Sequence, residues 1–436
     1  MMMYYNFIIL IVVSIAGSSG LPSVSLNTYP ITDFDELIID KKLSVKCGNT
    51  DYINLSKSQL YEIPKDLVKS DTIKSIFLRE NKISEVHKDV FKNAPNLECV
   101  DLTQNRIMLN QLKIQHDRLK TLILDNQQSS ETVDMSSNEI DYLVDSKAAL
   151  PNLRTLSLRG ASDISEHNLN FLVNAVPNLE IIYLSGSNLR FNHNISAYFP
   201  RLKRVYLDHT KSDFISIDNY GSVEELYLDN ISFRYFFLDS QVTTLKTLSL
   251  SNCSLSHPTK FSLPLLKSLD LSRNEFSNIN ADLFQNMSNL ENLNLGYNQL
   301  QEVPYLVYLN HLKQLSLNYN YITEFINMNM PNSLRVLSLK GNGITTIDKL
   351  AFSNLYQLQA LDLSENQIQS LPDGWDESLQ MLGHLNLRMN KFLNIQSMMI
   401  KYLPNLEEFY VKGNNFDSID ANSLQQLPNK CIVYTF

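Results

Sequence analysis

The sequence predicts an elongated α/β repeat solenoid, in which a parallel β-sheet of about 16–17 short strands forms one face and loops, short helices and 3-10 turns form the other. Three observations predict this fold. A chain of 436 residues is longer than one hydrophobic core usually supports. Apolar residues make up 44% and charged residues 19%, which excludes wholesale disorder and a multi-span membrane protein. Above all, one apolar pattern recurs every 21 to 26 residues, with a single wider gap of 34 residues.

The clearest repeat unit begins at Leu290, where residues 290–300 read LENLNLGYNQL. Leucines at its fourth and sixth positions alternate with polar residues, and this period of two is typical of a short strand with one buried face. One unit cannot bury these leucines alone, so we expect the units to stack and to pair their strands in parallel. A degenerate unit with Ile53 and Leu55 in its strand comes first. The first positions of the later units are Ile73, Leu97, Leu119, Leu153, Leu179, Leu202, Val223, Leu245, Leu266, Leu290, Leu312, Leu334, Leu358, Leu382 and Leu406.

Two further positions of the unit predict contacts between neighbouring coils. Asparagine at the ninth position can turn the chain away from the strand and bond the backbone of the next coil, which predicts an asparagine ladder. The ladder residues are Asn81, Asn105, Asn274, Asn298, Asn320, Asn342, Asn366, Asn390 and Asn414. Before seven of the units, an apolar residue six positions ahead of the next unit predicts a second spine on the convex side. The spine residues are Leu67, Phe91, Phe284, Leu306, Met328, Phe352 and Ile400.

Residues 351–366, AFSNLYQLQALDLSEN, resemble the extracellular class of leucine-rich repeats, whose unit is roughly 24 residues long. The resemblance covers about residues 50–420, and it extends to Toll-like receptor ectodomains, chaoptin-like proteins and insect leucine-rich immune proteins. It implies a leucine-rich repeat horseshoe whose concave sheet, or its flanks, binds another macromolecule. The cysteine clusters that usually cap such extracellular proteins are missing from this sequence.

The repeats are expected to be irregular over residues 108–152 and 153–253. In the first region, Leu122–Leu124 and Val133–Ile140 both fit the pattern although they are only eleven residues apart. Either one of them belongs to a long insertion or the register slips, and we favour both strands lying in the sheet with a short connection. In the second region the ladder is expected to be interrupted, with Cys253 as a buried structural thiol. The ladder position there holds Ala161, Ser187, Thr210, Ile231 and Cys253.

The second irregular region also carries the candidate binding site. The fifth position of the unit, in the middle of the exposed sheet face, is usually Ser, Asp, Asn or Thr, but three consecutive units have Tyr183, Tyr206 and Tyr227. Adjacent strands lie about 4.8 Å apart, so the rings should form a ladder on the concave face. Tyrosine suits binding surfaces because it presents a large area and a polar tip. Alternatively, the rings stack on one another without binding anything. The flanking candidates for ligand binding are Arg204, Asp208, His209, Glu225 and Asp229.

The chain ends are predicted to lie outside the repeats. An apolar run, Phe7–Ala16, followed by small residues predicts a signal peptide over residues 1–20 and a secreted protein. An N-terminal cap is expected over 21–49, repeats over 50–420 and a C-terminal cap over 421–436. No later apolar stretch is long enough to predict an integral membrane span. Sequons for N-glycosylation, the better ones first, lie at Asn194, Asn286, Asn54, Asn230 and Asn252.

The remaining cysteines allow at most one intrachain disulfide. Strand spacing places Cys47 and Cys99 about 10 Å apart, beyond disulfide reach unless the cap folds over the sheet. A thiol left over in a secreted protein suggests intermolecular pairing, and Cys431 is the first candidate for it.

The composition and motifs favour a binding protein rather than an enzyme. The net charge is −9, which argues against a nucleic-acid partner. The sequence has no nucleotide, protease or hydrolase motif, and its eight histidines lack metal-ligand spacing, so neither a cofactor nor a metal is expected. The first hypothesis is a secreted, non-enzymatic protein that binds a protein or glycan through its concave face, in innate immunity as the family resemblance implies. The alternative is a structural or adhesive matrix protein that self-associates through its edges, its convex face or Cys431.

Overall fold

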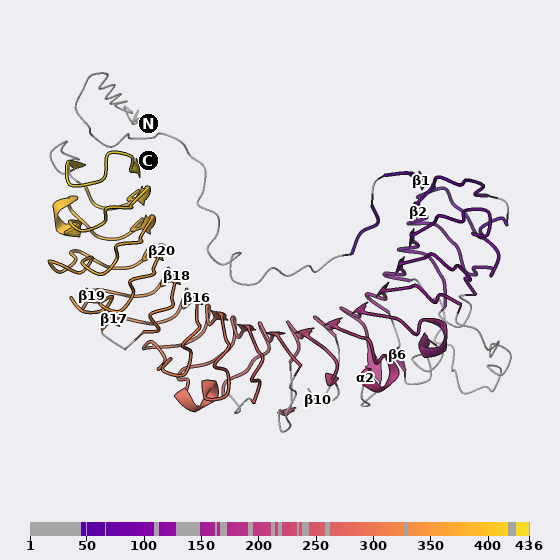
Figure 1. The fold of residues 1–436 in the computed structure, drawn as a ribbon, viewed down its shortest axis with the longest axis horizontal. Helices are drawn as coiled ribbons and strands as arrows, with labels where there is room; N and C mark the ends of the chain where they lie inside the picture. Colours follow the sequence, from indigo (N-terminus) through magenta and orange to yellow (C-terminus); the bar gives the residue numbers. More distant parts are fainter. Residues whose placement is uncertain are drawn as a thin grey trace, which may run out of the picture.

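A computed structural model of the protein describes residues 45–48, 50–65, 67–108, 113–127, 149–161, 164–165, 172–190, 195–210, 214–216, 220–232, 235–237, 244–257, 262–326, 330–416 and 424–435. The described coils stack side by side into an open horseshoe, with the strands on its inner, concave side (Figure 1). The signal peptide predicted at 1–20, most of the N-terminal cap, the strand predicted at Val133–Ile140 and the sequon at Asn194 lie outside the described residues.

The described residues form one 17-stranded sheet, in which every neighbouring pair is parallel and in the same register. This confirms the predicted parallel sheet of 16–17 strands. In spatial order the strands are β1 (Tyr52–Asn54), β2 (Ser75–Phe77), β3 (Cys99–Asp101), β4 (Thr121–Ile123), β5 (Thr155–Ser157), β7 (Ile181–Tyr183), β9 (Arg204–Tyr206), β11 (Glu225–Tyr227), β13 (Thr247–Ser249), β14 (Ser268–Asp270), β15 (Asn292–Asn294), β16 (Gln314–Ser316), β18 (Val336–Ser338), β20 (Ala360–Asp362), β21 (His384–Asn386), β22 (Glu408–Tyr410) and β23 (Ile432–Tyr434).

The convex side carries short elements of mixed type, as predicted. Three two-stranded parallel pairs lie there: β6 (Ile164–Ser165) with β8 (Leu189–Arg190), β10 (Phe214–Ser216) with β12 (Tyr235–Phe237), and β17 (Glu324–Phe325) with β19 (Thr346–Ile347). The short helix α2 (Ile195–Tyr198) and the 3-10 turns η3 (Ala281–Phe284) and η4 (Gln396–Met398) complete it. Elements of two to four residues suffice because each coil is stabilised by contacts with the neighbouring coils rather than by long elements of its own.

A continuous hydrophobic core lies between the sheet and the convex side. The leucines at the fourth and sixth positions of the unit, such as Leu293 and Leu295, are fully buried in it. The second spine is confirmed for its described members, while Met328 lies outside the described residues. The buried spine residues are Phe91, Phe284, Leu306, Phe352 and Ile400, with Leu67 partly buried.

The asparagine ladder is present at all nine predicted positions. In a typical rung, Asn320 Nδ2 donates to the carbonyl oxygens of Leu295 and Leu317, each at 3.0 Å, and Asn320 Oδ1 accepts from the Leu300 amide at 3.0 Å. The predicted interruption is real but incomplete. Ser187 Oγ and Cys253 Sγ still donate to the preceding coil, at 2.9 and 3.2 Å, whereas alanine and isoleucine have no group to do so. The other ladder asparagines make equivalent bonds.

Two regular features of the coil were missed from sequence. The eighth position of each unit from Ile73 onward has a positive φ of 51° to 76°, occupied mostly by residues other than glycine. In addition, asparagines just before the strands donate to the coil before them: Asn178 to the Pro151 carbonyl, Asn289 to that of Pro264 and Asn405 to that of Gln380, each at 2.8 Å. Both features fasten adjacent coils through backbone groups that would otherwise lack partners.

In the N-terminal third, one expectation is wrong, and another is met through the exception that the sequence analysis allowed. Strand β4 pairs directly with β5, with Leu122 opposite Leu156, so no strand from residues 133–140 lies between them. Cys47 and Cys99 do form a disulfide, the N-terminal disulfide, with Cα atoms 5.6 Å apart. The 10 Å expectation assumed that Cys47 stays in line with β1. Instead the chain before β1 crosses onto the concave side, where Cys47 packs with Phe77 and Cys99.

Candidate functional site

Three tyrosine rings lie stacked on the concave face of β7, β9 and β11. The ring centroids of Tyr183 and Tyr206 are 4.3 Å apart with planes at 8°, and those of Tyr206 and Tyr227 are 4.6 Å apart at 1°. The rings form a cluster separate from the main core, and the neighbouring inward residue Val205 belongs to that core. We call this cluster the tyrosine stack. Its place on the concave side agrees with the prediction.

The three rings of the tyrosine stack are less exposed than the sequence-based prediction of a binding surface implies. Tyr183, Tyr206 and Tyr227 are 5%, 2% and 3% exposed, because each ring covers its neighbour and because Val45 and Ile181 pack against the cluster. In the free protein the three rings therefore stack on one another. A partner would meet ring edges and hydroxyl groups rather than open ring faces.

Burial keeps the hydroxyl groups of the tyrosine stack neutral. Desolvation raises the pKa of Tyr183, Tyr206 and Tyr227 above the ordinary value of a phenol, and the carboxylate of Glu225 raises the pKa of Tyr227 further. Tyr227 donates its hydroxyl hydrogen to Glu225 Oε2 at 3.3 Å. At neutral pH the stack therefore presents hydrogen-bond donors and no negative charge of its own.

An ion pair runs along one side of the tyrosine stack, at the third position of the unit. Arg204 Nε lies 2.8 Å from Glu225 Oε1, which links β9 to β11. The two side chains are 42% and 26% exposed, so their mutual attraction adds about 1 kcal/mol or less to stability. The pair remains reachable for a ligand, and Glu225 joins it to the tyrosine stack.

The other predicted polar residues lie beyond the opposite ends of the strands. Asp208 accepts a hydrogen bond from Ser185 Oγ at 2.7 Å, and Asp229 accepts one from the Ser251 amide at 2.9 Å. These carboxylates fasten adjacent coils. His209 sits at the left-handed eighth position with φ 59° and is 65% exposed, and its Nδ1 lies 3.5 Å from Asp208 Oδ2. The structure thus groups Arg204 and Glu225 with the tyrosine stack and commits Asp229, which is 5% exposed, to contacts between coils.

Arg159 extends the tyrosine stack by one coil and was missed from sequence. Its Cζ lies 4.8 Å from the centroid of the Tyr183 ring, a cation–π contact. Arg159 holds the seventh position of the unit before Tyr183, so the available signal was a cation adjacent to the first of three tyrosines.

Two further tyrosine pairs stack elsewhere, one on the sheet and one in the turns that follow two of its strands. Tyr410 and Tyr434, at the fifth position in β22 and β23, have centroids 4.3 Å apart. Tyr297 and Tyr319, at the eighth position, are 4.5 Å apart, and Arg273 Cζ lies 4.2 Å from the Tyr297 ring. Stacked tyrosines therefore recur at equivalent positions of adjacent coils. Only the stack at β7, β9 and β11 has three rings among the described residues.

The free cysteines have no surface role in this structure. Cys431 is fully buried, and burial raises the pKa of its thiol to about 12. Its sulfur is therefore not available for the intermolecular disulfide expected from sequence. Cys253 is also buried, as expected.

Four sequon asparagines lie at the surface: Asn54, Asn230, Asn252 and Asn286. Asn252 Nδ2 donates to Asn230 Oδ1 at 2.7 Å, so these two share one patch on adjacent coils. Their glycosylation stays a prediction.

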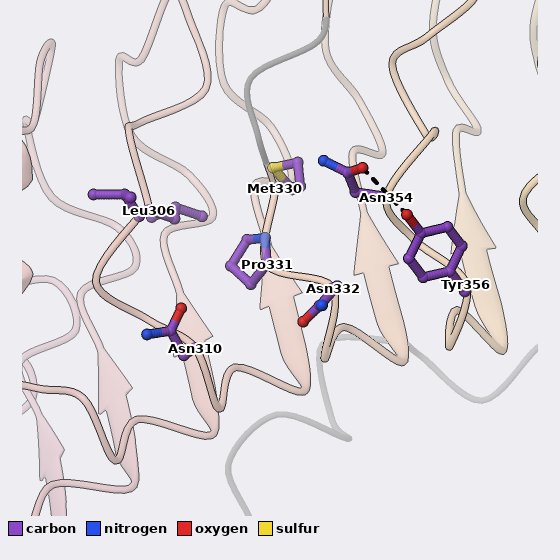
Figure 2. A pocket seen from close by; sticks show the side chains of 8 residues that line it. Leu306, Asn310, Met330, Pro331, Asn332, Asn354 and Tyr356 are labelled. Carbon is purple, nitrogen blue, oxygen red and sulfur yellow. Dashed lines mark hydrogen bonds between the residues drawn. The ribbon is translucent and has the colours of Figure 1, made fainter.

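A pocket of about 320 Å³ lies among the loops that lead into β16, β18 and β20, away from the tyrosine stack. Figure 2 shows Asn310, Asn332 and Asn354 around it, with the Tyr356 hydroxyl bonded to Asn354 Oδ1 at 3.5 Å. Within the described ranges, no three His, Cys, Asp or Glu side chains are grouped to hold a metal ion. None of the helices described here has the length and apolar character needed to cross a membrane.

Family models match both halves of the chain. A model described as leucine rich repeat matches residues 243–300, 264–322 and 332–392. A model described as BspA type leucine rich repeat region matches residues 36–132.

Among curated proteins, mouse podocan is 24% identical over 410 residues, which cover 85% of this chain and 64% of podocan. Human Toll-like receptor 3 is 25% identical over 274 residues, which cover 54% of this chain and 28% of the receptor. The chain thus spans less than two thirds of either relative.

Solved structures share the fold. A leucine-rich repeat protein from Leptospira interrogans superimposes with a TM-score of 0.64 at 22% identity, covering 88% of this chain and 95% of that one. Toll, in its complex with Spatzle from Drosophila, superimposes with a TM-score of 0.52 at 18% identity, covering 85% of this chain and 49% of that one.

Proposed function

Because the chain is a leucine-rich repeat protein that resembles Toll-like receptor ectodomains, we propose that it is a secreted, non-enzymatic binding protein. In this proposal it recognises a protein or glycan partner through the concave face of β7, β9 and β11, and it serves innate immunity. The observation that carries the proposal is the tyrosine stack, flanked by the Arg204–Glu225 pair and lying outside the core.

The size of these tyrosines is not required by the fold. On the two strands that flank the stack, the same position of the unit holds Ser157 and Ser249. These serines pair in the same register with Tyr183 and Tyr227. Three adjacent large side chains therefore add area that strand pairing does not need. Tyrosine gives much contact area for little loss of side-chain entropy, and its hydroxyl can bond a polar group of a partner.

The immune role is supported by the similarity to Toll alone. The Toll–Spatzle complex is described as a molecular hub in Drosophila development and innate immunity. That description is of Toll. For this chain, a role in innate immunity is part of our proposal.

A second candidate function is self-association, as in a structural or adhesive matrix protein. Large apolar side chains are exposed in the loops just before several strands, on one flank of the coil: Leu265, Tyr308, Tyr356, Met381 and Tyr402 are 37% to 54% exposed. Such a row can bury itself against a second copy. Light scattering on the purified chain separates the two functions, because self-association predicts a dimer or larger species at micromolar concentration.

The binding function is tested by affinity capture from the native extracellular fluid, identification of the captured molecule by mass spectrometry, and titration of that molecule. We expect replacement of Tyr206 by alanine to weaken binding about 30-fold, the effect of losing one central anchor of about 2 kcal/mol. Tyr206→Phe keeps the stacking, so it separates loss of the hydroxyl from loss of the ring. Tyr410→Ala, in the stack at β22, is the matched control and should bind normally. Equal binding by the Tyr206→Ala and wild-type proteins, both folded by circular dichroism, would refute the proposal.

A further inference from the structure

The pocket among the loops that lead into β16, β18 and β20 has an apolar floor and a polar rim. Leu306, Met330 and Pro331 are buried and form its floor, whereas Asn310 and Asn332 are exposed at its rim. Its volume of about 320 Å³ lies at the lower end of the range for small-molecule sites, about 300–1,000 Å³. We call it the asparagine pocket.

The side-chain amides of the asparagine pocket are not used by the fold. Within the described part of the chain, those of Asn310 and Asn332 make no hydrogen bond, and Asn354 Oδ1 accepts one long bond from the Tyr356 hydroxyl, at 3.5 Å. Other asparagines just before strands, such as Asn289, donate instead to the preceding coil. Figure 2 shows the three pocket asparagines, one from each of the three loops, around a shared space. Their amides are therefore available to a ligand.

The lining of the asparagine pocket favours a neutral ligand that carries hydroxyl groups. None of the described residues that line it is charged, so an ionic ligand would find no counter-charge there. An asparagine amide offers two N–H donors and an acceptor oxygen, and a hydroxyl group can both donate and accept, so the two groups can pair in either direction. Tyr356 and Val307, 54% and 41% exposed, add apolar area beside the amides.

A sugar matches this lining better than a peptide does. Strands β16, β18 and β20 each pair with a strand on both sides, so they leave no open edge for an extended peptide. Grooves for proline-rich peptides are lined by aromatic rings, and among the described lining residues Tyr356 alone is aromatic. A sugar ring presents C–H groups on its face and hydroxyl groups around its edge, which match the apolar floor and the amide rim.

We propose that the asparagine pocket binds a neutral sugar unit of a glycan. The C–H face of the ring packs on the apolar floor, and its hydroxyl groups bond the amides of Asn310 and Asn332. The pocket is separate from the tyrosine stack, so this site goes beyond the proposed function, and neither depends on the other.

The first experiment uses neutral and anionic sugars with the full chain. Saturation-transfer difference spectra are recorded during titration with maltose, with N,N′-diacetylchitobiose and with glucuronate. We expect a saturable response from at least one of the two neutral disaccharides and a weaker response from glucuronate. The absence of a saturable response from both neutral disaccharides, or a stronger response from glucuronate, would overturn the proposal.

The second experiment locates the bound disaccharide with variants. Asn310→Ala and Asn332→Ala should each raise its dissociation constant about tenfold, because a sugar hydroxyl loses its hydrogen-bond partner. Both side chains are exposed, so the variants should fold, which circular dichroism checks. Tyr402→Ala is the matched control, since this exposed tyrosine lies on the same flank outside the asparagine pocket, and it should bind like the wild type.

Two results of the second experiment would overturn the inference. One is unchanged binding by both asparagine variants. The other is a loss of binding in Tyr206→Ala alone, which would place the sugar at the tyrosine stack and leave the proposed function standing.

Discussion

The asparagine ladder makes a quantitative prediction at Asn320. The residue is 5% exposed. Its side chain bonds the Leu295 carbonyl and the Leu300 amide in the coil of β15, and the Leu317 and Asn318 carbonyls in its own coil, that of β16. In Asn320→Ala the Leu300 amide loses its acceptor in a buried place, while the Leu295 carbonyl keeps a bond from Asn298 Nδ2 at 3.0 Å. One orphaned amide costs about 1–3 kcal/mol and two lost donor bonds about 1 kcal/mol each, so we expect a destabilisation of about 4 kcal/mol.

The assay has to report local as well as global stability, because a repeat solenoid need not unfold as one unit. Urea unfolding gives the free energy, and hydrogen exchange at the Leu300 amide reports the rung itself. Asn289→Ala is the matched control, since this exposed asparagine makes a single bond, to the Pro264 carbonyl, and should cost about 1 kcal/mol. If Asn320→Ala cost no more than Asn289→Ala, or left exchange at Leu300 unchanged, the ladder bonds would not be what stabilises adjacent coils.

Three further predictions concern other parts of the fold. Replacing both cysteines of the N-terminal disulfide by serine removes a cross-link with a sequence separation of 52. The chain-entropy model predicts that such a cross-link stabilises the protein by about 4 kcal/mol, and urea unfolding should show most of this loss in the free energy of unfolding. Gly341→Ala would put a Cβ 2.3 Å from the Tyr319 ring at φ +69°, so its melting temperature should fall by several degrees, whereas Gly343→Ala, with 3.7 Å to its nearest neighbour, should melt like the wild type. Finally, the buried thiols of Cys253 and Cys431 should resist alkylation in the native state up to about pH 9 and react after unfolding. Burial shields both thiols, and a pKa of about 12 keeps the Cys431 thiol protonated over that range. Rapid labelling of Cys431 in the native protein would contradict its burial.

Much of the candidate site followed from position within the unit. Tyr183, Tyr206 and Tyr227 share the fifth position of adjacent units, so strand pairing alone predicts that their rings meet. Their near-complete burial did not follow, because it depends on how closely the rings approach and on the packing of Val45. The role of Asp229 was misjudged for a related reason. An acidic residue at the seventh position is expected from sequence to face solvent. In the structure, Asp229 instead accepts a hydrogen bond from the Ser251 amide of the next coil.

The sequence by itself determined the solenoid, its parallel sheet, the buried leucine rows and the asparagine ladder. Each of these depends on residues at fixed spacing within one unit, and stacking repeats the same local geometry in every coil. Only the tertiary structure decided that Cys47 reaches β3, that β4 pairs directly with β5, and that Arg159 lies over Tyr183. These contacts join segments outside the repeat or side chains of different coils, and the repeat period places no constraint on them.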